Sequence, residues 1–263
     1  MRAYRAVARV AWSTVLVYRG NFLLQLVGVA VQTVALLAVW RVVLVDGEGN
    51  PSGFTWEEMK AYLLVAFATG TVLSGFTDSL LADRVLSGAV ALDLVKPVDY
   101  QLARFAEALG YLLAEILSVA VMGAVLVLAF GGIPVPSGVP AVLFMVSLLA
   151  VVPLKFGLVY LTGLASFWTE NYQGVSLTRV AVTNILSGAL VPIALYPEAL
   201  RWLCQVSPFA GIVSTPALLY LGRVDGAAAV RLILWQLFWA LVLWAGARMV
   251  FRAALRRLVV HGG

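Results

Sequence analysis

Long apolar runs separated by short polar stretches dominate this chain. About 20 apolar residues let a helix cross a bilayer, whereas the strands of a membrane barrel are short and alternate apolar with polar positions. Since lipid accepts only helices or closed barrels, the pattern predicts an all-α polytopic membrane protein with one transmembrane domain, residues 1–263. The six predicted spans cover about 22–45, 59–81, 108–130, 140–167, 180–193 and 227–250.

The first 20 residues do not belong to a span, because basic and apolar positions recur there at helical spacing. Arg2, Arg5 and Arg9 share one face of a helix, and Val10 belongs to another face. This pattern predicts an amphipathic helix over residues 1–20 that lies in the membrane interface. A simple extension of the first span is the alternative.

The longest polar interruption covers residues 82–107 and carries Arg84 and Lys96. Proline lacks an N–H group and disfavours helical geometry in the residue before it. We therefore expect a short helix over Ser87–Val95 that ends in a turn at Pro97.

The apolar pattern breaks up between the last two predicted spans, over residues 194–226. Four prolines and several glycines interrupt residues 187–223, which are too broken for one span and too apolar for a free loop. We expect short interfacial or re-entrant helices on the extracellular side.

The composition excludes several classes of protein. Hydrophobic residues make up 62% of the chain, and its 18 basic and 13 acidic residues amount to 12%, about half of what soluble domains carry. This excludes an ordinary soluble enzyme, a disordered chain and a disulfide scaffold. Cys204 has no second cysteine to pair with, and His261 is the only histidine, so a histidine-cluster metal site is not expected. The net charge of +5 suits anionic membrane lipid, and we expect no nucleic-acid partner.

Basic residues are distributed unequally between the two sides of the predicted topology. Such an excess marks the cytoplasmic side, so both termini are expected in the cytoplasm. The richer side has Arg2, Arg5, Arg9, Arg19, Arg84, Lys96, Arg104, Arg179, Arg248, Arg252, Arg256 and Arg257, and the other has Arg41, Lys60, Arg201, Arg223 and Arg231.

Sequence motifs for membrane-embedded chemistry are absent. The chain has no H-E-x-x-H, no G-x-S-x-G, no cysteine pair and no Gly-Lys dipeptide of a phosphate-binding loop. We therefore expect neither an enzyme nor a bound metal or cofactor. If the protein uses ATP, another polypeptide must bind the nucleotide and its Mg²⁺.

The candidate polar residues of the membrane interior are Asp78, Glu115 and Lys155. An unpaired Lys155 near the middle of a bilayer would cost about 2.5–3.5 kcal/mol or more. One hypothesis is that Glu115 and Lys155 pair or face an aqueous cavity. A purely structural ion pair, or a lysine whose ammonium reaches toward the interface, is the alternative.

Two stretches of the chain resemble those of ABC-2-type permeases, the membrane subunits of ABC transporters. RVLSGAVALDLVKPVDYQLARFAEALG (Arg84–Gly110) is similar to the Ser-Gly, Asp-Leu and basic-Pro-Val pattern of bacterial members. LSGALVPIALYPEALRWLCQVSPFAGIVSTPALLYLG (Leu186–Gly222) is similar to their succession of Ser-Gly and prolines. The resemblance covers the whole chain, although its motifs are diffuse, and it implies the type V exporter fold.

The resemblance also implies roles for particular residues. The loop 82–107 would form a helix that couples the permease to its ATPase subunit, with charged groups pairing across the interface. The N-terminal helix would lie against the same partner, and the Pro/Gly-broken segment would cap the translocation path. The residues concerned are Arg84, Ser87, Gly88, Asp93, Lys96, Pro97 and Asp99 for coupling, and Pro192, Pro197, Pro208 and Phe209 for the cap.

The function implied is export of an apolar or amphipathic compound from a bacterium through its inner membrane. Two permeases, identical or related, would enclose the path, and a separate ATPase would supply the energy. A secondary transporter is one alternative, but such proteins usually show inverted repeats with broken helices in both halves. A membrane scaffold without transport activity is the other.

Overall fold

The computed structural model of the chain describes residues 2–17, 19–46, 53–73 and 77–256, which form helices and turns without a strand among them. The helices are α1 (Arg2–Val17), α2 (Arg19–Arg41), α3 (Trp56–Thr71), α4 (Thr77–Leu86), α5 (Val90–Leu94), α6 (Tyr100–Phe130), α7 (Val139–Leu164), α8 (Tyr172–Leu186), α9 (Glu198–Val206), α10 (Ser214–Tyr220) and α11 (Gly226–Leu255). Short π- or 3-10 segments are η1 (Val42–Asp46), η2 (Ala165–Phe167), η3 (Ile193–Leu195) and η4 (Phe209–Gly211).

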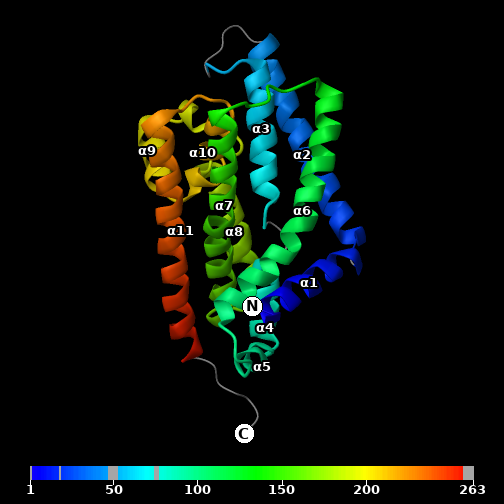
Figure 1. The fold of residues 1–263 in the computed structure, drawn as a ribbon, viewed down its shortest axis with the longest axis vertical. Coiled ribbons are helices and arrows are strands. Elements are labelled where there is room, and N and C mark those ends of the chain that lie inside the picture. Colours follow the sequence, from blue (N-terminus) through cyan, green and yellow to red (C-terminus); the bar gives the residue numbers. More distant parts are fainter. Residues whose placement is uncertain (1, 18, 47–52, 74–76, 257–263) are drawn as a thin grey trace.

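Helix α7 occupies the centre of the molecule. It packs against α11, α4, α10 and α8, and Figure 1 shows α7 and α11 running lengthwise beside each other. Gly157 permits the close approach of α11, because a Cβ atom there would lie 2.7 Å from Cβ of Leu243. The short helix α5 lies at one end of the molecule and α9 and α10 lie at the other (Figure 1).

Two of the described helical segments are long and apolar enough to cross a membrane, Val139–Phe167 and Gly226–Leu255. A third crossing is possible by length and composition if α9 and the segment Phe209–Tyr220, which meet at a bend of 73°, count as one broken span. Many large apolar side chains are exposed on the outer helices, as the hydrocarbon core of a membrane requires. The six-span arrangement stays a prediction.

The second predicted span, residues 59–81, is not one helix. Helix α3 begins with a capping box, in which the Thr55 side chain accepts a hydrogen bond from the Glu58 N–H and the Glu58 carboxylate accepts one from the Thr55 N–H. The helix ends at Thr71, and Leu73 follows with a φ of 54°, which non-glycine residues rarely adopt. Helix α4 is therefore a separate element.

The helix at the fifth predicted span, residues 180–193, begins and ends earlier in the chain than predicted. Helix α8 already begins at Tyr172, because the Asn171 side chain accepts a hydrogen bond from the Gly174 N–H. It ends before Gly188, whose φ of +82° stops helical geometry. Polar residues assigned to a loop are thus helical, and some apolar residues assigned to the span are not.

Helix α1 packs against the rest of the protein on one side and is exposed on the other. Helix α1 packs along α6, and Figure 1 shows it oblique to the long helices. Ala11 is buried there, whereas Val10, predicted on the apolar face, is exposed. Gly110 of α6 makes this contact possible, because a Cβ atom at that position would lie 2.3 Å from the carbonyl oxygen of Ala8.

Candidate functional site

The turn between α4 and α6 projects from one end of the molecule (Figure 1). We call residues 86–98, which include α5, the tip. Gly88 has a φ of +73° that lets the chain turn after α4, and the Ser87 side chain donates a long hydrogen bond to the Arg84 carbonyl oxygen. Helix α5 ends at Leu94, shortly before the exposed Pro97.

A network of charged side chains holds the tip against α4 and α6. The buried Asp93 carboxylate accepts hydrogen bonds of 2.6 Å from Arg84 and 2.6 Å from Lys96. Arg84 also donates to Glu107, 3.1 Å away, and Glu107 forms an ion pair of 2.6 Å with Arg104. Burial raises the pKa of the Asp93 carboxyl, but hydrogen bonds from Lys96 and Arg84 lower it by more, so the pKa lies below its usual value. Asp93 therefore stays charged at neutral pH.

The charges of the tip are already paired within the chain. Asp93 is only 7% exposed and binds side chains of its own chain, because a buried carboxylate needs charged partners nearby. The side chains of Leu92 and Val95 are 73% and 83% exposed, and that of Lys96 is 62% exposed. That charges of the tip also pair with a partner protein stays a prediction.

Asp99 lies where three elements meet. Its carboxylate caps α6 by accepting a hydrogen bond from the Leu102 N–H, and it also binds Arg248 of α11. Its backbone N–H donates to the Tyr4 hydroxyl of α1, 3.3 Å away. The resemblance implied a coupling role for Asp99, and in the structure this residue joins α1, α6 and α11.

The basic residues predicted on the N-terminal helix are only partly described. Arg5 and Arg9 are exposed, as the interfacial helix requires. The side chain of Arg2 lies outside the described residues.

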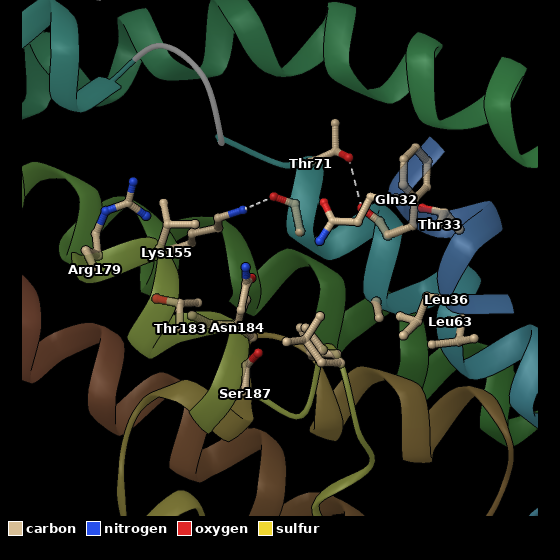
Figure 2. A pocket seen from close by; sticks show the side chains of 18 residues that line it. Gln32, Thr33, Leu36, Leu63, Thr71, Lys155, Arg179, Thr183, Asn184 and Ser187 are labelled. Atoms are coloured by element: carbon tan, nitrogen blue, oxygen red, sulfur yellow. Dashed lines mark hydrogen bonds between the residues drawn. The ribbon is translucent and has the colours of Figure 1, made fainter. Parts of the chain in front are cut away.

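The polar groups predicted inside the membrane gather at the end of α3. The ammonium group of Lys155 donates hydrogen bonds to the carbonyl oxygens of Thr69, 3.0 Å away, and Gly70, 2.5 Å away (Figure 2). The Glu115 carboxylate accepts one of 2.6 Å from the Leu73 N–H. The two charges therefore stabilise the same helix break from two sides, while the side chain of Asp78 lies outside the described residues.

The three prolines predicted for the cap each precede a short helical segment. Pro192 precedes η3, Pro197 precedes α9, and Pro208 precedes η4, which starts at the partly buried Phe209. Proline suits these positions because its missing N–H has no partner at a helix start.

Two tryptophans of α11 hold this broken segment in place. The indole N–H groups of Trp235 and Trp239 donate to the carbonyl oxygens of Gln205 and Val206, where α9 ends. These bonds satisfy carbonyl groups that the end of a helix leaves unpaired.

Comparison with known families agrees with this architecture. A family model described as "ABC-2 family transporter protein" matches residues 29–262, most of the chain. The chain belongs to the ABC-2 transporter family. None of the curated proteins that were compared with it matches. Membership makes the chain a membrane protein of an ABC transporter and implies a partnership with an ATPase subunit.

Several residues of this ABC-2 protein's polar sites were not singled out from the sequence. Arg104 and Glu107 complete the charged network of the tip, and Arg248 binds Asp99 from a helix 149 residues away. The i, i+3 spacing of Arg104 and Glu107 on one helix was a usable signal. No local signal could have indicated Arg248.

Proposed function

We propose that this chain is the permease subunit of a bacterial ABC exporter, located in the inner membrane with both termini in the cytoplasm. Two such subunits, either identical or related, enclose a path for an apolar or amphipathic compound. The family membership and the apolar outer surface of the helices support this proposal.

Within this proposal the chain does not hydrolyse ATP itself. It lacks the sequence of a phosphate-binding loop, so a separate ATPase subunit binds ATP and Mg²⁺. The chemistry required of the permease is then limited to binding and movement.

The observation that carries the proposal is the exposed apolar surface of the tip. The tip, which carries the exposed Leu92 and Val95, lies at the end of the molecule where α11 also ends (Figure 1). Exposed apolar groups on a rigid element are typical of a protein docking site. The network around Asp93 supplies that rigidity, so a push on the tip would be transmitted into α4 and α6.

Co-purification tests the proposal. The chain should co-purify with the ATPase subunit encoded beside its gene, and the complex should hydrolyse ATP in an orthovanadate-sensitive way. The double variant Leu92→Asp/Val95→Asp should weaken this association about tenfold or more, because two charges would have to be buried in the contact.

The variant Val135→Asp provides a matched control. Val135 is also apolar and exposed, but it lies in the connection between α6 and α7, at the end of the molecule opposite the tip. The control should bind the ATPase normally. Equal binding by the double variant and the wild type would exclude the tip as the docking element, and transport that continues without any ATPase would favour a secondary transporter.

A further inference from the structure

A cavity of about 250 Å³ lies between α2, α3, α7 and α8, and Lys155 reaches its wall (Figure 2). The tip lies outside it, so the cavity belongs to a different part of the molecule. Its walls consist of Gln32, Thr33, Leu36, Leu63, Ala66, Phe67, Gly70, Thr71, Lys155, Arg179, Val180, Thr183, Asn184, Ser187, Ala189, Leu190, Ile212 and Val213.

The charged residues of the cavity lie on one side. Figure 2 shows Arg179 and Lys155 there, and Leu36 and Leu63 on the other side, beside the uncharged polar residues Gln32 and Thr33. The aliphatic side chains of Ile212 and Leu190 add to the apolar part of the wall. Such a cavity suits a molecule that has a polar group at one end and an apolar body.

Helix α8 and its C-terminal capping residue Ser187 place three polar residues at the cavity wall at four-residue spacing: Arg179, Thr183 and Ser187. The hydroxyl groups of Thr183 and Ser187 have no hydrogen-bond partner among the described residues, and Ser187 is fully buried. A buried polar group without a partner costs about 1–3 kcal/mol. These hydroxyls are therefore available to a ligand in the cavity.

The charge of the cavity wall is positive. Lys155 and Arg179 contribute two cations, and no acidic residue is among the described residues that line the cavity. Glu115 does not line the cavity, and its carboxylate accepts a hydrogen bond from the Leu73 N–H and interacts electrostatically with Lys155, so one acid stands against two cations. In a low-dielectric surrounding this arrangement favours a ligand with a negative charge.

We propose that this cavity binds an amphipathic molecule through a single anionic headgroup, a carboxylate or a phosphate. The headgroup contacts Arg179 and the hydroxyls of α8, and the apolar body lies toward Leu36 and Ile212. Since drug-sized pockets have about 300–1,000 Å³, a cavity of 250 Å³ holds the headgroup and the start of the tail, and the remainder extends into the bilayer. The assignment of this ligand as the cargo rests on the proposed export function. The binding of the ligand to the cavity does not depend on that function.

Photolabelling of the full chain, without any ATPase, tests the binding. The purified protein is placed in nanodiscs of phosphatidylcholine and labelled with a diazirine derivative of hexadecanoic acid, or with the matched alcohol or amine. The acid should label peptides of α8 and α3 at concentrations about tenfold lower than the alcohol, because a charge-assisted hydrogen bond is lost with the alcohol. Equal labelling by acid, alcohol and amine would overturn the proposal, and this comparison needs no variant.

Variants then locate the site. Arg179→Gln and Thr183→Val should each raise the acid concentration for half-maximal labelling, Arg179→Gln by about tenfold. The matched controls are Arg231→Gln and Thr178→Val, whose side chains are exposed and outside the cavity, and these should label like the wild type. Gel filtration and thermal unfolding identify any variant that misfolds. Labelling that Arg179→Gln and Thr183→Val both leave unchanged would place the ligand elsewhere and refute the assignment.

Competition distinguishes two sources of the same headgroup chemistry. Phosphatidylglycerol that displaces the labelled acid identifies a bilayer lipid as the occupant, whereas labelling that persists identifies a single-chain anion. Both results support an anionic amphiphile in the cavity. Because the assay lacks the ATPase, its failure leaves the docking experiment at the tip unaffected, and a failure of docking leaves the labelling result unaffected.

Discussion

The charged side chains of Lys155 and Glu115 lie inside the bundle because they bind backbone groups where α3 ends. The carbonyl groups of Thr69 and Gly70 lie in the last turn of α3, where a helix leaves carbonyl groups unpaired, and Lys155 donates to both. Glu115 binds the N–H of Leu73, whose left-handed backbone costs about 1–3 kcal/mol. The charges thus stabilise a break that an apolar sequence would not make by itself.

The substitution Lys155→Met should destabilise the chain by about 1–3 kcal/mol, because buried carbonyl groups lose a charged donor while the side-chain volume is kept. Thermal unfolding of the purified chain in detergent measures this loss. The matched control is Lys96→Met, an exposed lysine in an ion pair, which should cost less than about 1 kcal/mol. If the two variants unfold alike, the ammonium group of Lys155 is not needed at the helix end.

The substitution Gly188→Ala should destabilise the chain by more than about 1 kcal/mol. Gly188 has a φ of +82°, and a Cβ atom there would lie 2.8 Å from the Tyr62 hydroxyl oxygen, which donates a hydrogen bond to the Gly188 carbonyl. Gly222→Ala is the control, since Gly222 has a φ of +64° but no neighbour closer than 3.7 Å. Thermal unfolding should therefore show a larger loss for Gly188→Ala, and equal losses would mean that crowding at Tyr62 contributes nothing.

At the scale of whole elements, α1 is attached to α6 through small residues. Ala8 and Ala11 approach Gly110 so closely that any side chain at Gly110 would meet the α1 backbone. Tyr4 adds one hydrogen bond to the Asp99 N–H. The position of α1 therefore depends more on this close approach than on its arginines, of which Arg5 and Arg9 are exposed.

The substitution Gly110→Ala should detach α1 and increase amide hydrogen exchange across residues 2–17 about tenfold, because the protection lost is worth at least about 1.4 kcal/mol. Gly28→Ala in α2 is the control, since a Cβ atom there meets nothing within 4 Å. Mass spectrometry of peptides from the exchanged protein gives the comparison. An unchanged exchange rate would show that α1 shifts to accommodate the methyl group.

The existence of the helices could be predicted from apolar runs, but several of their ends could not. The start of α8 at Tyr172 has a local signal, the capping residue Asn171. This signal is hard to recognise in the sequence because the neighbouring residues are also polar. The end of α3 has no local signal, because it depends on Lys155, 85 and 86 residues away along the chain. For the same reason the partners of Asp93 could not be predicted, because they include residues of two other helices.

At the scale of the whole molecule, Asp99 connects the tip to distant parts of the chain. It contacts Tyr4, 95 residues earlier, and Arg248, 149 residues later. The elements α1, α6 and α11 therefore meet where a partner would push on the tip. Helices α6 and α11 do not line the cavity, but α6 packs against α3 and α11 packs against α7, two helices of its wall, so movement of the tip and access to the cavity can be linked through these contacts.

The substitution Arg248→Gln tests this connection, because it removes the charge that binds Asp99 and leaves the exposed apolar side chains of the tip intact. The ATPase should still bind, but the amount of cargo transported per ATP hydrolysed should fall by up to about fivefold, since an exposed ion pair contributes at most about 1 kcal/mol. Proteoliposomes that contain both subunits measure this ratio. Arg252→Gln, on the next turn of α11, is the control and should keep the wild-type ratio.

The double variant Asp99→Asn/Arg248→Gln should be no worse than either single variant, because both remove the same ion pair. Equal ratios for Arg248→Gln and Arg252→Gln would show that the movement of the tip reaches the cavity by another route, through α4 and the break after α3.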